Sequence, residues 1–173
     1  GYEKKKYKQT ILWRYKIMYS KLYKNAIKAE QEIVKASISD KPSNWFYGSY
    51  TENNCVYDCL TEGHVLIAFT FDTFMLNKAM FETRNKVLNI NIAKLLEKQL
   101  SYELAQLVGT KNVDKDVLCI LKTETGDEVF FNKKYQKYFT DDVEYRVHDS
   151  KSPIRIYSNG VFMGIILPVY VRE

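Results

Sequence analysis

Basic residues spaced seven apart near the N-terminus are the strongest chemical signal in this sequence. Arg14, Lys21, Lys28 and Lys35 recur at heptad intervals, which keeps them on one face of a helix with a drift of about 20° per heptad. Cationic side chains in such a stripe can bind phosphates, because each contact releases counterions condensed on a nucleic acid. The predicted nucleic-acid-binding residues are Lys4, Lys8, Arg14, Lys21, Lys28 and Lys35.

The distribution of charge along the chain indicates that this basic stripe binds a partner. Residues 1–41 hold 11 Lys and Arg against 4 Asp and Glu, a net charge of +7, whereas the other 132 residues hold 15 basic and 17 acidic residues, a net charge of −2. This asymmetry exceeds what solubility requires and favours a polyanion or an acidic protein as the partner. A solvated helix face and a membrane-surface helix are the alternative interpretations.

A zinc site formed by cysteine and histidine residues is a second possible function of this sequence. Cys55, Cys59 and His64 could supply three ligands, with Cys119 or His148 as the fourth, but the pattern lacks the paired knuckles of specific zinc motifs. Free cysteine is most often buried as a small apolar side chain. We therefore expect buried cysteines on or beside strands, a reducing compartment, and no metal or other cofactor.

A metal-dependent nuclease is a third reading, because such enzymes need converging carboxylates and a lysine. Asp141, Asp142, Asp149 and Lys151 offer those residue types, although both acidic stretches also have the composition of solvated turns. The sequence contains neither a Gly-x-Ser-x-Gly elbow nor a Gly-x-x-x-x-Gly-Lys phosphate loop. We therefore expect a protein that is not an enzyme.

Two helices are predicted to position these residues. Residues 2–38 contain neither Gly nor Pro, and their apolar residues recur every three or four positions, which indicates a long amphipathic helix that ends before Pro42. Residues 89–108 repeat leucine at similar intervals and are followed by Gly109, which is typical of a helix C-terminus. The short segment 74–81 is predicted to be helical as well.

The remaining segments predict antiparallel strands. Turn residues such as Ser158-Asn159-Gly160 separate short stretches rich in apolar residues, which is typical of hairpins. The predicted strands are 45–50, 55–60, 64–71, 117–122, 128–131, 143–147, 154–157 and 161–169, with a short helix over 132–139. The predicted fold class is α+β, in which a basic helix (1–41) precedes a mostly antiparallel α+β domain (42–173) that carries the second long helix.

The last part of the chain resembles a domain of the bacterial DNA sliding clamp, the processivity factor of replication. The resemblance covers residues 126–171 and lies in Phe131-Asn132-x-x-Tyr135, then Val143 and Asp149, Ser152-Pro153-x-x-Ile156, and the closing Gly164-Ile165-Ile166-Leu167-Pro168-Val169. It implies a clamp-like fold for this region. Clamps join two or three such domains per chain into a ring, so a ring of this chain would require self-assembly and a homo-oligomer.

These features together predict a non-enzymatic binding protein. Its basic helix would engage DNA, RNA or an enzyme that already holds nucleic acid. The alternative is an inhibitor from a phage or mobile element, of the anti-CRISPR type, that blocks a host nucleic-acid enzyme by protein–protein contact. The longest uncharged apolar run spans residues 161–171, too short for a membrane helix, so we expect a cytoplasmic protein without a membrane span.

Overall fold

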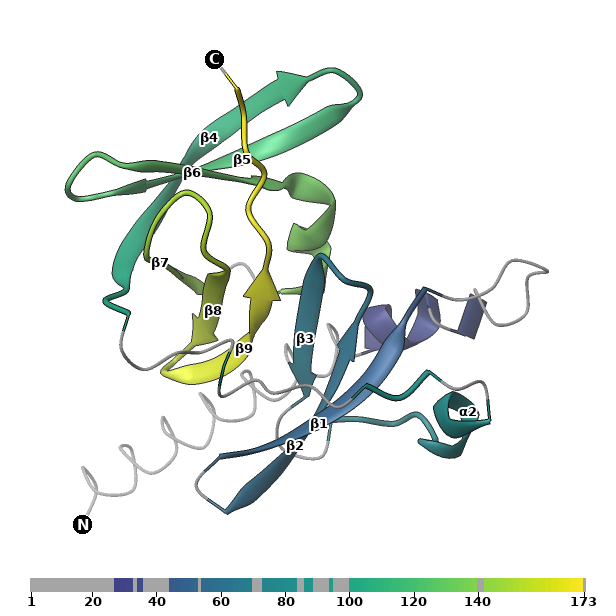
Figure 1. Cartoon of the computed structure of the whole chain (residues 1–173). Helices are drawn as coiled ribbons and strands as arrows, with labels where there is room; N and C mark the ends of the chain where they lie inside the picture. Colours follow the sequence, from purple (N-terminus) through teal and green to yellow (C-terminus); the bar gives the residue numbers. More distant parts are fainter. Residues whose placement is uncertain are drawn as a thin grey trace, which may run out of the picture.

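The structure is a computed structural model that describes residues 27–32, 34–35, 44–52, 54–69, 73–83, 86–88, 94, 100–139 and 142–172. These residues form one nine-stranded antiparallel sheet in the order β1-β2-β3-β9-β8-β7-β4-β5-β6 (Figure 1). The strands are β1 (Phe46–Glu52), β2 (Cys55–Thr61), β3 (Val65–Phe69), β4 (Glu103–Val113), β5 (Asp116–Thr123), β6 (Glu128–Asn132), β7 (Glu144–Val147), β8 (Ile154–Ser158) and β9 (Val161–Ile166).

Short turns between neighbouring strands explain why the hairpin predictions are confirmed. Asn159 and Gly160 both have positive φ, 49° and 77°, as the tight turn that joins β8 to β9 requires. Gly126, with φ of 94°, occupies the predicted turn between β5 and β6. Eight of the nine strands fall within or close to the predicted ranges.

The predicted α+β fold with long helices is wrong, because segment 103–113 is a strand and not the end of a helix. Its backbone pairs with β5 over eight residues and with β7 over three. Gly109 adjoins an irregularity in the β5 register and does not cap a helix. Leu104 and Leu107 are 47% and 43% exposed, so the leucine spacing that suggested a buried helical face does not mark a core.

Helical segments among the described residues are short. They include residues 27–32 and 34–35, α2 (Ala79–Glu82) and the 3-10 helix η1 (Lys133–Tyr138). The first belongs to the predicted N-terminal helix, and the rest of that prediction lies outside the described residues. α2 begins later than the helix predicted over 74–81. None of the helices in the described part of the chain is long and apolar enough to cross a membrane.

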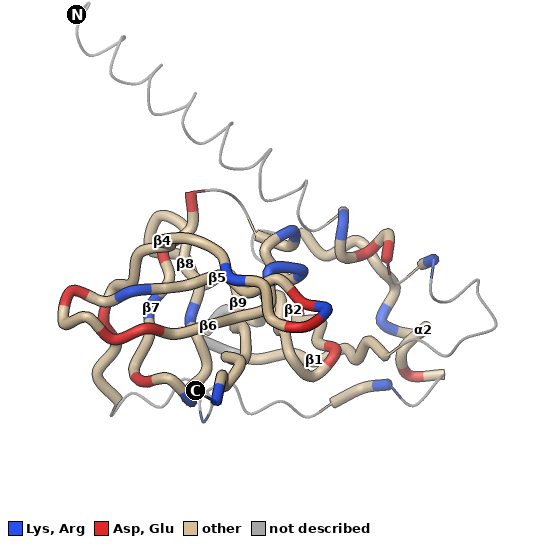
Figure 2. The backbone as a smooth tube through the Cα atoms, turned by 90° about the horizontal axis from the view of Figure 1, so that it is seen from above, with Lys and Arg blue, Asp and Glu red and all other residues tan. Residues whose placement is uncertain are grey.

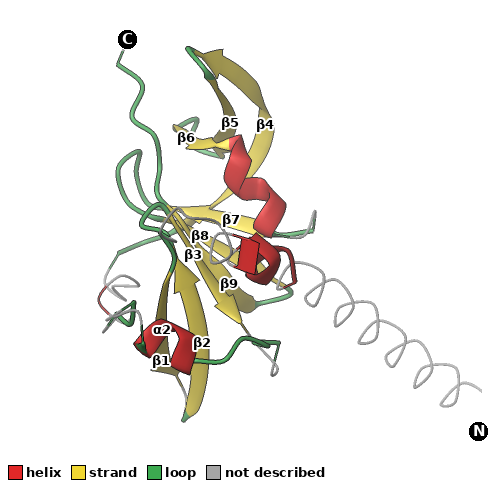
Figure 3. Cartoon of the chain, turned by 90° about the vertical axis from the view of Figure 1, so that its right-hand side faces the viewer, coloured by secondary structure: helices red, strands yellow, loops and turns green. Residues whose placement is uncertain are grey.

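Strands β4 to β9 curve into a ring that the C-terminal segment closes. Val169, beyond β9, donates its N–H to the carbonyl oxygen of Phe130 on β6 at 2.7 Å. The three-stranded meander β1-β2-β3 continues the sheet from β9, and Figure 3 shows β1 and β2 at the opposite end from β4 and β5. The core extends through both parts, with Phe131, Ile156 and Ile166 fully buried.

Candidate nucleic-acid interface

The described end of the predicted N-terminal helix, residues 27–32, is attached to the body of the protein through Glu30. This side chain is 6% exposed, and its Oε1 accepts the backbone N–H groups of Met75 at 2.6 Å and Leu76 at 3.2 Å. Burial raises the pKa of the Glu30 carboxyl, although the two hydrogen bonds oppose that shift. Ala29 beside it is completely buried, so this side of the helix faces the body.

Glu32 provides the second attachment, to η1. Its two carboxylate oxygens contact the ammonium group of Lys137 and the hydroxyl group of Tyr138, which donates a hydrogen bond. Burial opposes ionisation of Glu32, but the contacts with Lys137 and Tyr138 outweigh it and lower the pKa of Glu32. Burial and the neighbouring carboxylate raise the pKa of Tyr138. Residues more than a hundred positions apart are thereby joined.

Lys28 and Lys35 lie on the exposed side of this helix end. An α-helix turns 100° per residue, so residues seven apart share a face, whereas Glu30 lies about 200° from Lys28. Lys28 and Lys35 are exposed, but Glu32 lies on their side of the helix, and the charge of Lys35 helps to lower the pKa of Glu32. The other predicted binding residues, Lys4, Lys8, Arg14 and Lys21, lie outside the described residues.

Further lysines lie next to this helix end on η1, and the sequence analysis did not assign them to the site. Lys133 and Lys134 are exposed, and Lys137 joins the two elements through Glu32. Figure 2 shows blue positions gathered where the helix end meets the body. The signal was present in the sequence as three lysines within five residues, but only the contact of Lys137 with Glu32 shows that η1 meets this helix end.

Two of the three cysteines have described side chains, and that of Cys55 lies outside the description. Cys59 and Cys119 are buried free cysteines, as predicted, and burial raises the pKa of both thiols. His64 stacks against Tyr135 with ring centroids 6.4 Å apart and lies 3.5 Å from Glu62. No three His, Cys, Asp or Glu residues within the described ranges are placed to hold a metal ion.

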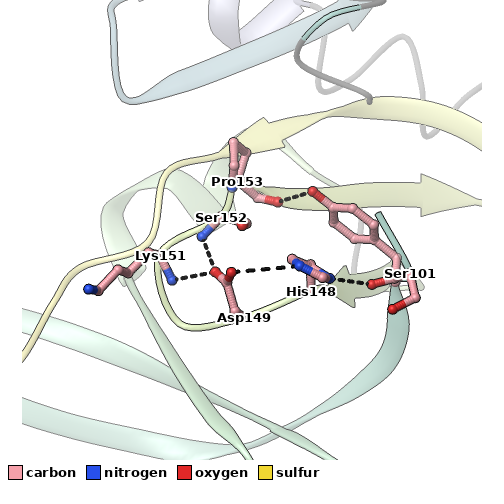
Figure 4. A network of polar contacts seen from close by, with 7 residues as sticks. Ser101, His148, Asp149, Lys151, Ser152 and Pro153 are labelled. Carbon is pink, nitrogen blue, oxygen red and sulfur yellow. Dashed lines mark hydrogen bonds and ion pairs between the residues drawn. The ribbon is translucent and has the colours of Figure 1, made fainter. Parts of the chain in front are cut away.

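Asp149, a candidate nuclease residue, shapes a turn (Figure 4). Its Oδ1 accepts the backbone N–H groups of Lys151 at 2.8 Å and Ser152 at 2.5 Å, and these bonds lower the pKa of the carboxyl. His148 places Nδ1 2.6 Å from the carbonyl oxygen of Ser101 and Nε2 3.8 Å from Asp149. Asp142 is exposed before β7, and residue 141 lies outside the described ranges. The geometry gives the nuclease hypothesis no support.

A groove of about 580 Å³ opens where β4 separates from β7. It is lined by residues 104–107 of β4, Gln136 of η1 and residues 143–145 at the start of β7. β4 pairs with β7 only over residues 103–105. Beyond that point, residues 106–113 pair with β5 on one side and with none of the described strands on the other. This open edge includes the exposed side chains of Leu107 and Val108.

Comparison with known proteins finds no match among family models, curated proteins or solved structures. The resemblance of residues 126–171 to a sliding-clamp domain therefore stays a prediction. Within this region the structure assigns local roles to the motif Phe131-Asn132-x-x-Tyr135. Phe131 and Tyr135 are buried, and the Asn132 side chain caps η1 by accepting the N–H of Lys134 at 3.0 Å.

Proposed function

We propose that this protein is a non-enzymatic binding protein that engages nucleic acid, or an enzyme holding nucleic acid, through its basic N-terminal helix. One observation carries the proposal: the described end of that helix is fixed to the body by Glu30 and Glu32, and Lys28 and Lys35 remain exposed. This attachment holds Lys28 and Lys35 at the surface, where a partner can reach them.

The neighbouring lysines of η1 strengthen this interpretation. Lys133 and Lys134 are two exposed cations on η1, the short helix that Lys137 joins to the helix end, so exposed positive charge is present on both elements. Clustered positive charge attracts a polyanion over a distance set by ionic strength, and the attraction falls as salt rises. The predicted signature of this function is therefore affinity with a steep dependence on salt.

Replacing Lys28 and Lys35 together by glutamine is expected to weaken binding of a duplex and to reduce its salt dependence. A plot of log affinity against log salt concentration has a negative slope, and each lost phosphate contact makes it shallower by about 0.9. The slope of the double variant should therefore be smaller in magnitude by about 1 to 2. Titrations of labelled DNA at several salt concentrations measure this slope.

The matched control replaces Lys115 and Lys122, two exposed lysines of the β4–β5 hairpin, by glutamine. This control removes the same charge from another surface and should leave most of the slope intact. An equal loss in both double variants would mean that only net charge matters. Binding without salt dependence would rule out direct phosphate recognition.

The second candidate function is inhibition of a nucleic-acid enzyme by protein–protein contact, as an anti-CRISPR-type protein of a phage or mobile element would act. The open edge of β4 favours it. Exposed strand edges pair readily with other chains, and proteins usually protect them with charges, proline or a covering element. Here the edge presents Leu107 and Val108 beside a groove, which suits an extended segment of a partner protein.

A cleavage assay with a candidate nuclease separates the two functions. If inhibition acts through β4, Leu107→Glu should weaken it about tenfold or more, since a charge would replace an apolar contact. The double charge reversal Lys28→Glu and Lys35→Glu should then leave inhibition intact. If the helix binds the nucleic acid or the enzyme, the charge reversal should abolish the effect and Leu107→Glu should preserve it.

A further inference from the structure

The turn between β2 and β3 presents an exposed histidine beside η1 (Figure 1). The side chain of His64 is 69% exposed. Its ring plane lies only 12° from that of Tyr135 on η1, and the two ring centroids are 6.4 Å apart. Because Tyr135 covers one face of the imidazole ring, the exposed area belongs to the edges and the outer face of that ring.

Hydrogen bonds fix the backbone of this turn around His64. Its N–H group donates to Oε1 of Glu62 at 3.1 Å, and its carbonyl oxygen accepts the N–H group of Leu167 at 2.8 Å. The hydroxyl group of Thr61 donates to the carbonyl oxygen of Val65 at 2.7 Å. A ring on such a turn has its orientation before a ligand arrives, which reduces the entropy lost on binding.

Glu62 joins the turn to η1. Its Oε1 lies 3.5 Å from Nδ1 of His64, and its carboxylate accepts a hydrogen bond from the hydroxyl group of Tyr135. Burial raises the pKa of Tyr135 to about 12, and the charges of Glu62 and of Asp116 on β5 add to this shift. The phenol therefore keeps its proton and stays a donor to Glu62. This carboxylate, 22% exposed, holds the two rings in place and leaves the outer face of His64 accessible.

A cation lies beside the same tyrosine ring. Nζ of Lys134 is 4.9 Å from the centre of the Tyr135 ring, so the ammonium group and the centre of the imidazole ring both lie within 6.4 Å of that point. Lys134 and its neighbour Lys133 are exposed. Lysines bind backbone phosphates, and flat aromatic rings stack on unpaired bases. Groups suited to both parts of a nucleotide therefore converge on Tyr135.

We infer that His64 and Lys134 bind single-stranded nucleic acid, with an unpaired base stacked on the outer face of the His64 ring and a backbone phosphate at Lys134. Bases of a duplex stack on one another and do not offer their faces, whereas those of a single strand do. The inference rests on the proposed nucleic-acid function and names a ligand class for it. The two surfaces are connected, because η1 meets the helix end through Lys137 and Glu32.

Two substitutions of His64 test the stacking contact. His64→Ala removes the ring and should weaken binding of a labelled oligothymidine about tenfold. His64→Phe restores a flat ring without the imidazole nitrogens and should bind within about twofold of the parent. Tyr170→Ala is the matched control, because it removes a ring that is 65% exposed and lies 5.7 Å from Lys151; it should change affinity less than about twofold. Fluorescence anisotropy at fixed salt measures all four proteins.

Lys134→Gln tests the phosphate contact. On a single strand, each lost phosphate contact makes the plot of log affinity against log salt concentration shallower by about 0.7, and this variant should show that change. Lys122→Gln, which changes an exposed lysine on β5, should keep the slope of the parent. Equal slopes for the two lysine variants would contradict a phosphate at Lys134.

The outcomes separate this inference from the proposed function. It is supported if His64→Ala weakens single-strand binding, His64→Phe restores it, and duplex affinity changes less than about twofold in both. It is overturned if His64→Ala binds like Tyr170→Ala, if His64→Phe loses as much as His64→Ala, or if duplex and single strand lose affinity equally. A loss confined to the Lys28 and Lys35 double variant would overturn the single-strand site and retain the proposed function, whereas a loss confined to His64→Ala would do the reverse.

Discussion

Replacing Gly164 by alanine is expected to lower the free energy of unfolding by roughly 3–5 kcal/mol, from backbone strain and overpacking together. Gly164 has φ of +152°, and an added Cβ would lie 2.1 Å from the carbonyl oxygen of Leu66 and 3.0 Å from the ring of Phe139. The first of these neighbours is backbone in β3 and cannot move without disturbing its pairing with β9. The substitution therefore disturbs the pairing of β3 with β9, where the meander β1-β2-β3 meets the ring of strands β4 to β9.

The matched control is Gly109→Ala, which makes the same change in β4. Its added Cβ would meet nothing within 4 Å, so we expect its unfolding free energy to differ from that of the parent by less than about 1 kcal/mol. Urea unfolding of both variants measures the difference. Equal stability of the two variants would show that β3 and β9 do not approach each other as closely as described.

Local signals made most strands predictable from the sequence. Turns such as Asn159-Gly160 determine their own geometry, because glycine and asparagine adopt positive φ more readily than other residues. The neighbouring stretches then pair as hairpins, as β8 and β9 do. The segment from β5 to β9 was therefore predicted with small errors at the strand ends, including the short helix η1.

Long-range pairing explains what the sequence could not predict. β4 has leucines at helical spacing, but its backbone hydrogen bonds with β5 and β7 override that local pattern. The contact between β3 and β9 joins residues about a hundred positions apart. The bridge between Phe130 and Val169 depends equally on the tertiary fold. None of these pairings can be recognised from a short stretch of the sequence, because the paired residues are far apart along the chain.

In the candidate site, too, the local features could be predicted from the sequence and the long-range contacts could not. The heptad spacing predicted that Lys28 and Lys35 share a face, and both are exposed on the helix end. It could not predict that Glu30 and Glu32 attach that helix end, because their partners Met75 and Lys137 are distant in sequence.

Phe131→Ala is the second substitution with a large expected effect, about 3–5 kcal/mol of unfolding free energy. Phe131 is completely buried, and its ring lies 5.5 Å from that of Tyr145 on β7. The truncation would leave a cavity inside the ring of strands that its neighbours can fill only in part. Thermal or urea unfolding measures this loss of stability. Nucleic-acid binding at a temperature where the variant stays folded should be unchanged.

Phe130→Ala provides the comparison, because this neighbour on the same strand points to the other face. Phe130 is half-buried, and Lys111 lies 5.9 Å from its ring centre, so its truncation should cost less than half as much as that of Phe131. A similar loss from both would contradict the assignment of Phe131 to the core. The expected asymmetry would mean that Phe131, the first residue of the Phe-Asn-x-x-Tyr pattern, stabilises the fold by packing in the core.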